Sequence, residues 1–198
     1  MTKARTLADF GSANTILTST STLNPANLDT AGAIPSALLA DVGGGITEAD
    51  QWRITSNFTG NATPITSNWE RSDNTGYSEL GTGLTNSSGI FSFPSTGVYI
   101  IYAQMSVQFM EEDTDSIMSI ATTVNNGSSY YAQSTTREAD KNSDGRHHSM
   151  SCMAVFDVTD VATHKFRIDA QSVGSTNVVK GDSGETITGF TVFRLADT

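Results

Sequence analysis

The run of residues 89–109, GIFSFPSTGVYIIYAQMSVQF, constrains the fold of this chain more than any other segment. A proline and a glycine lie within the four-residue cluster 94–97, between two apolar stretches. These residue types favour a tight turn, because proline holds φ at about −65° and glycine tolerates positive φ. The run therefore predicts a hairpin, with one strand, a tight turn and a second, longer strand.

The second strand of this run is apolar on both of its faces. Every odd position from Tyr99 to Phe109 is apolar, which is the period-2 pattern of a row of side chains that faces a core. The opposite face begins with Val98, Ile100 and Tyr102. Because an antiparallel strand normally turns one face to water, the second apolar face predicts a further contact, most simply with another copy of the chain.

The composition favours strands over helices and excludes several classes of function. Serine, threonine, asparagine and glycine are abundant, and all four are weak helix formers. The net charge of −10 argues against nucleic-acid binding, which requires clustered lysine and arginine. We find neither a secretory signal nor a membrane-spanning stretch, so we expect the protein to be made and folded in a cytoplasm.

The first 45 residues differ from the rest of the chain and predict an N-terminal arm that ends in a glycine linker. Residues 1–45 have no period-2 pattern, whereas Ile34, Leu38 and Leu39 have the spacing of a short helix. Composition alone leaves two alternatives open, a disordered tail and an attachment arm that becomes ordered on a partner. We assign residues 46–198 to a single folded domain.

Turn signals recur at short intervals from residue 46 onward, which is typical of an all-β sandwich or barrel. An Asn-Gly pair at 126–127 and an Asp-Gly pair at 144–145 are further hairpin signals. Strands are predicted at residues 51–58, 76–80, 89–93, 98–109, 116–124, 129–137, 148–158, 165–173 and 186–195. Eight or nine strands in roughly 150 residues fit an antiparallel jelly roll.

Three short motifs resemble the tumour-necrosis-factor-like (TNF-like) jelly roll of complement globular heads. They are Phe93-Pro94, the Gly97-Val98-Tyr99 opening of the long strand, and Gly189-Phe190 in the last strand. The resemblance covers residues 46–198 and implies that the long strand and the last strand lie side by side on an inner sheet. It also implies a homotrimer. Carried over onto this sequence, the trimer interface would contain Val98, Ile100, Tyr102, Ile187 and Phe193. Complement and cytokine activities are not carried over, because function belongs to sites rather than to folds.

A second resemblance concerns structural proteins of tailed phages, especially marine and cyanobacterial ones. The segments QWRI at 51–54, FTG at 58–60 and PITSN at 64–68 resemble the opening of head domains in such proteins. The N-terminal TKAR at 2–5 and LADF at 7–10 also resemble virion protein N-termini. The resemblance implies a protein of the virion surface that is assembled in the host bacterial cytoplasm. Its attachment arm would use Leu7, Phe10, Ile34, Leu38 and Leu39.

Three roles remain open at this stage. A tail or neck fibre would bind other virion proteins of the capsid, portal, neck or tail and touch a host surface glycan or protein. A capsid decoration protein would clamp neighbouring capsid subunits. A carbohydrate-binding or carbohydrate-degrading module would need an aromatic platform, for which Trp52 and Trp69 are the candidates. No enzyme signature is present in the sequence, so we expect a protein that is not an enzyme.

The segment at 140–145, DKNSDG, matches the first half of a calcium loop. Oxygen atoms of Asp140, Asn142 and Asp144 could converge on a calcium ion. The twelfth position of such a loop is Ser151, which lacks the bidentate glutamate of calcium loops. A structural turn and a calcium site therefore both remain open, and we expect no other cofactor.

Overall fold

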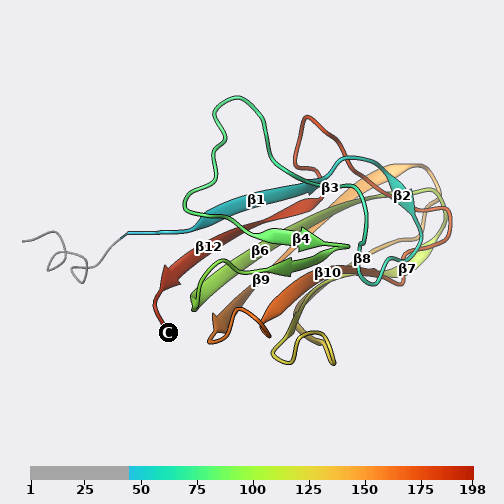
Figure 1. Ribbon diagram of the computed structural model, residues 1–198. Helices are drawn as coiled ribbons and strands as arrows, with labels where there is room; N and C mark the ends of the chain where they lie inside the picture. Colours follow the sequence, from blue (N-terminus) through green and yellow to red (C-terminus); the bar gives the residue numbers. More distant parts are fainter. Residues whose placement is uncertain (1–44) are drawn as a thin grey trace, which may run out of the picture. The chain divides into compact units, whose positions relative to one another are not determined.

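A computed structural model describes residues 45–198 of the chain (Figure 1). The chain divides into two units, residues 1–44 and residues 45–198, and only the second is described here. The predicted attachment residues Leu7, Phe10, Ile34, Leu38 and Leu39 lie outside the described residues. Residues 45–198 form twelve β-strands. Within these residues, no helix has the length and apolarity needed to cross a membrane.

The strands form two antiparallel sheets, as predicted. Sheet A contains β1 (Ala49–Ile54), β2 (Phe58–Thr59), β3 (Trp69–Arg71), β6 (Gly97–Phe109), β9 (Arg146–Val158), β11 (Val178–Val179) and β12 (Gly189–Ala196). Sheet B contains β4 (Thr85–Ser87), β5 (Ile90–Ser92), β7 (Asp113–Thr123), β8 (Tyr131–Asp140) and β10 (Lys165–Gln171). The described part of the chain is therefore an all-β sandwich.

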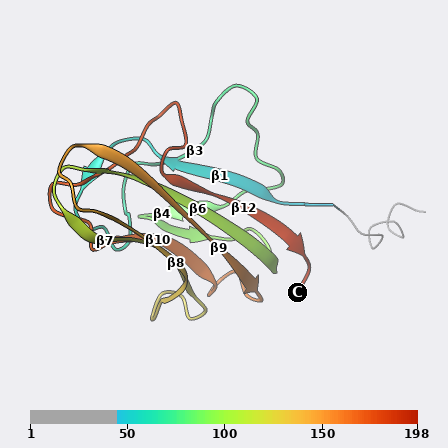
Figure 2. The same cartoon turned by 180° about the vertical axis from the view of Figure 1, so that it is seen from behind.

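The long strand β6 organises sheet A. One of its edges pairs with β9 over the full length of both strands. Its other edge pairs with β12 and then with the short β11, and β12 continues the sheet to β1 and β3. Figure 2 shows β9, β6 and β12 side by side. Sheet B has the order β4-β5-β10-β7-β8.

The predicted hairpin at the start of β6 is wrong, because the two strands of that run belong to different sheets. Strand β5 pairs with β4 and β10 in sheet B, whereas β6 pairs only within sheet A. The turn at 93–96 therefore crosses from one sheet to the other. Phe93 and Tyr99, on either side of that turn, contact each other with ring centroids 4.6 Å apart. The two strands do not pair, and their apolar side chains face each other across the core.

The strand predicted at 76–80 is also wrong. Only Leu80 forms a bridge there, to Ala49 at the start of β1. Gly76 and Gly81 have φ values of 93° and 79°, which interrupt an extended backbone. The sequence analysis missed β3, β4 and β11, which have only two or three residues each and are too short for a period-2 pattern to show.

The core contains the apolar row of β6 and an aromatic cluster. All six odd-numbered residues of β6 from Tyr99 to Phe109 are fully buried, as their alternation predicts. Phe91 is at the centre of the cluster, with its ring centroid 4.6 Å from that of Phe190 and 5.4 Å from that of Trp52. Trp69 also packs edge-on against Phe91, at 5.2 Å. Both tryptophans therefore contribute to the core.

Candidate functional site

The side of sheet A that faces away from the core carries the most prominent candidate site. Because the odd residues of β6 point into the core, Ile100 and Tyr102 point away from it. The strand register places Ile100 beside Val155 of β9 and Phe193 of β12. Tyr102 lies beside Met153 of β9. Side chains from three adjacent strands therefore form one surface.

This surface is both apolar and exposed. Tyr102 is 40% exposed, Met153 is 55% exposed and Val155 is 59% exposed. We call it the apolar face, and it consists of Val98, Ile100, Tyr102, Met153, Val155 and Phe193. A contiguous exposed apolar surface of this kind marks an interaction site in most soluble proteins.

Most of the predicted interface residues lie on this surface. The structure brings Val98, Ile100, Tyr102 and Phe193 together, since β6 and β12 are paired. Ile187 lies in the loop before β12, where its carbonyl oxygen is 3.4 Å from the side-chain nitrogen of Gln104. Met153 and Val155 were missed by the sequence analysis. The signal that could have found them is the predicted strand at 148–158, which carries apolar residues on both faces.

The loop before β12 covers part of the same side of sheet A. Gln104 of β6 donates to the carbonyl oxygen of Thr186. Asn74 donates to the carbonyl oxygen of Gly184 at 2.6 Å, so the loops after β3 and before β12 are joined. The large exposed apolar side chains of the apolar face belong to β6 and β9.

The segment proposed as a calcium loop uses its carboxylates for contacts within the protein. Asp140 accepts a hydrogen bond from the backbone nitrogen of Asn142 at 2.8 Å, and its other oxygen lies 3.1 Å from Nε2 of His148. Asp144 forms an ion pair with Arg146 at 2.7 Å. Within residues 45–198, no group of three or more His, Cys, Asp or Glu side chains is arranged to hold a metal ion. This geometry favours the structural turn, and calcium binding stays a prediction without structural support.

A buried carboxylate, Asp113, joins two loops at one end of the sandwich. It accepts hydrogen bonds from the Ser116 hydroxyl at 2.7 Å, and from the Gly174 backbone and the Asn177 side chain at 2.9 Å each. Burial alone would raise the pKa of Asp113, but these donors and the backbone nitrogen of Asp115 hold it below its usual value. The sequence analysis missed this role.

We expect the Asp113→Asn variant to be less stable than the unaltered protein by about 1–3 kcal/mol at pH 7, because buried donors lose their charged acceptor. A carboxyl whose pKa is lower in the folded state stabilises the fold above its ordinary pKa of about 3.9. That contribution disappears as the pH falls through the folded-state value. Acid destabilisation should therefore be shallower in the variant. Urea unfolding between pH 7 and pH 3 measures this, with the exposed Glu112→Gln as control. Parallel pH profiles for the unaltered protein and Asp113→Asn would contradict it.

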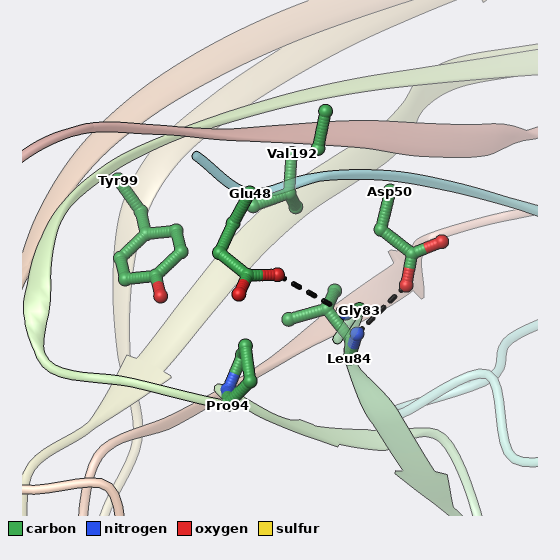
Figure 3. Close-up of a pocket in the computed structure, with 8 residues that line it drawn as sticks. Glu48, Asp50, Gly83, Leu84, Pro94, Tyr99 and Val192 are labelled. Atoms are coloured by element: carbon green, nitrogen blue, oxygen red, sulfur yellow. Dashed lines mark hydrogen bonds between the residues drawn. The ribbon is translucent and has the colours of Figure 1, made fainter. Parts of the chain in front are cut away.

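A second buried carboxylate, Asp50, organises the long loop between β3 and β4 (Figure 3). It is 4% exposed and accepts hydrogen bonds from Arg71 at 3.0 Å and from the Leu84 backbone nitrogen at 2.7 Å. The Tyr77 hydroxyl and the Trp52 indole nitrogen donate to it at 2.9 Å each. Burial, together with the bond to Asp50, raises the pKa of Tyr77 to about 12.

The cavity beside Asp50 is too small for a ligand. It is lined in part by Glu48, Pro94 and Tyr99 and has a volume of about 10 Å³. A space of that size holds about one water molecule. We therefore assign Asp50 and its partners a structural role.

Comparisons with known proteins identify the fold and leave the function open. No family model matches the chain, and no curated protein matches it. Among solved structures, murine APRIL at pH 5.0 superposes with a TM-score of 0.55 at 13% identity, covering 75% of this chain and 98% of that chain. Eiger TNF from S. frugiperda superposes with a TM-score of 0.53 at 14% identity, covering 78% of this chain and 96% of that chain. The fold is a TNF-like jelly roll.

The TNF-like fold confirms the predicted fold class. The pairing of β6 with β12 is also the arrangement that the sequence resemblance implied. At identities this low the likeness concerns the fold alone, because one fold supports many functions. The complement-head subtype and the phage origin stay predictions.

Proposed function

We propose that this chain is a structural protein of a tailed-phage virion and is not an enzyme. In this proposal it is a homotrimeric surface appendage, such as a tail or neck fibre or a receptor-facing head. A TNF-like head spans residues 46–198, and residues 1–45 anchor it to the particle. The phage assignment is supported by the resemblance of residues 51–68 and of the N-terminal segment to phage structural proteins.

The proposal of a trimer rests on the exposed apolar face of sheet A. Leaving Tyr102, Met153 and Val155 in water is unfavourable by about 25 cal/mol for each Å² of apolar surface. A head-to-tail contact that closes after three copies would cover this face in each subunit. The proposed interface therefore contains Met153 and Val155 in addition to the residues predicted from sequence.

The proposed location is the surface of the virion, after assembly in the bacterial cytoplasm. Partners would be other virion proteins of the capsid, portal, neck or tail, and a glycan or protein of the host surface. Immunogold labelling of intact particles tests the placement. Label at the tail or neck supports the appendage, whereas label spread over the capsid supports a decoration protein.

The structure gives little support to the carbohydrate module. Its aromatic platform would have required exposed tryptophans. Trp52 and Trp69 instead pack edge-on against Phe91 in the core. We therefore propose the virion structural role rather than the carbohydrate module.

Deletion of residues 1–45 is expected to leave a soluble head that no longer joins particles. The folded core lies within residues 45–198, so the head should keep its β-sheet circular dichroism spectrum. Sedimentation of particles from infected cells, followed by immunoblotting, measures incorporation. Incorporation of the truncated protein at the level of the full chain would refute the anchoring role.

A further inference from the structure

The turn between β7 and β8 contains Asn126 and Gly127, the only Asn-Gly pair in the chain. Both residues are exposed. In such a pair the backbone nitrogen of the glycine can attack the side-chain carbonyl carbon of the asparagine, because glycine has no side chain to obstruct a close approach. Spontaneous deamidation is therefore chemically easiest at Asn126.

Deamidation at Asn126 needs only water and a weak base. The backbone nitrogen of Gly127 loses its proton and forms a bond to Cγ of Asn126, and the bond from Cγ to the side-chain nitrogen breaks. The side-chain nitrogen takes up a proton and leaves as ammonia, so a cyclic succinimide remains. Addition of water to either carbonyl group opens the ring to aspartate or isoaspartate. Both products add a negative charge, and isoaspartate also lengthens the backbone by a methylene group.

The fold restrains the nitrogen that would make the attack. The backbone nitrogen of Gly127 donates to the hydroxyl oxygen of Thr123 at 3.1 Å. Thr123 is only 1% exposed, so water has little access to compete for this hydroxyl. The same hydroxyl donates to the side-chain oxygen of Asn125 at 2.7 Å and accepts from the backbone nitrogen of Asn125 at 3.2 Å. The Thr123 hydroxyl therefore holds the turn closed and keeps the amide proton of Gly127 in a hydrogen bond within the protein.

The backbone conformation of the turn also opposes the attack. Asn126 and Gly127 have φ values of 55° and 87°, in the left-handed region. In that region ψ is about +47°, which turns the nitrogen of the following residue away from the side chain. The backbone nitrogen of Asn126 donates to the carbonyl oxygen of Thr163, in the loop after β9, at 2.9 Å, and this restrains rotation of the Asn126 backbone. Deamidation therefore requires a local opening of the turn that breaks these hydrogen bonds.

We propose that the Thr123 hydroxyl protects Asn126 from deamidation by holding this turn closed. Asn126 is then a modification site that the fold keeps unreactive, and its rate of deamidation reports how often the turn opens. This inference goes beyond the proposed virion function and does not depend on it. Deamidation would weaken the attachment of the turn to the loop after β9, because that attachment runs through the backbone of Asn126.

Incubation of the full-length chain at mildly alkaline pH tests the proposal. Peptide mass spectrometry after digestion measures aspartate and isoaspartate at position 126 over time. Thr123→Val removes the hydroxyl and keeps a side chain of similar size. Thr122→Val is the matched control, because the buried Thr122 hydroxyl accepts a hydrogen bond from the Gln133 side chain at 2.9 Å and none from Gly127. We expect deamidation about fivefold faster in Thr123→Val than in the unaltered chain, and an unchanged rate in Thr122→Val.

The same three chains unfolded in urea show whether the hydroxyl acts through the fold. All three should then deamidate at one common rate, at least about tenfold faster than the folded unaltered chain. A Thr123→Ser variant keeps a hydroxyl at the same position and should retain most of the protection. Thermal unfolding of each variant establishes that it is folded under the conditions of the incubation.

Two results would overturn the proposal. One is a folded unaltered chain that deamidates as fast as the unfolded chain, and the other is a folded Thr123→Val variant that deamidates at the unaltered rate. Amide hydrogen exchange of the unaltered protein gives a test that needs no variant. The backbone amide of Gly127 should exchange at least about tenfold more slowly than in an unfolded peptide, and exchange at the unfolded rate would also refute the protection.

Discussion

Replacement of Tyr102 by aspartate is expected to dissociate the trimer while leaving the head folded. Tyr102 lies on the apolar face, between Met153 of β9 and Thr191 of β12. In the proposed trimer, the new carboxylate would be buried in each of three contacts without a partner, which is strongly unfavourable. We expect a loss of about 2 kcal/mol or more per contact. In the isolated head Tyr102 is already 40% exposed, so the change in the free energy of unfolding should stay within about 1 kcal/mol.

Light scattering at micromolar concentration measures the oligomeric state of this variant. Tyr131→Asp is the matched control, because Tyr131 is an exposed tyrosine at the start of β8, away from the apolar face. The control should remain trimeric. A stable monomer of the unaltered protein under these conditions would refute the trimer. A trimeric Tyr102→Asp variant would show that another surface forms the contact.

Replacement of Asp50 by alanine is expected to cause the largest loss of stability among these variants, about 3 kcal/mol. The change leaves the backbone nitrogen of Leu84 and the indole nitrogen of Trp52 without their acceptor in a buried environment. It also removes the ion-pair partner of Arg71, whose side chain is 31% exposed and keeps part of its hydration. The loop between β3 and β4 should be held to β1 more weakly, through the remaining Leu80–Ala49 bridge.

Urea unfolding at pH 7 measures this loss. Asp50→Asn keeps the size of the side chain and part of its hydrogen bonding, so we expect it to cost about half as much. Glu112→Ala removes an exposed carboxylate from the loop between β6 and β7 and should change the free energy of unfolding by less than about 0.5 kcal/mol. Equal stability of Asp50→Ala and Glu112→Ala would contradict the structural role of Asp50.

The class of the fold could be predicted from the sequence because side-chain alternation is a local property of a strand. The buried row from Tyr99 to Phe109 follows directly from the period-2 pattern of β6. The turn residues at 126–127 also have the positive φ that their sequence predicts, 55° for Asn126 and 87° for Gly127. Each of these features depends on neighbours within a few positions along the chain.

The roles of Asp50 and Asp113 could not be predicted in this way. In sequence, Asp113 belongs to an acidic run that is typical of a solvated loop. Its donors at Gly174 and Asn177 lie 61 and 64 positions away along the chain. A carboxylate becomes a buried structural acceptor only where distant backbone and side-chain donors converge on it.

The sequence by itself determined that β6 has two apolar faces, because each face is a row of alternate residues in one strand. Only the tertiary structure decided that β5 and β6 lie in different sheets, since the choice between pairing and crossing depends on which distant strands occupy their edges. It also decided that Met153 and Val155 extend the apolar face beside Tyr102. Strand register joins residues that are about 50 positions apart, and no local pattern specifies which of them become neighbours.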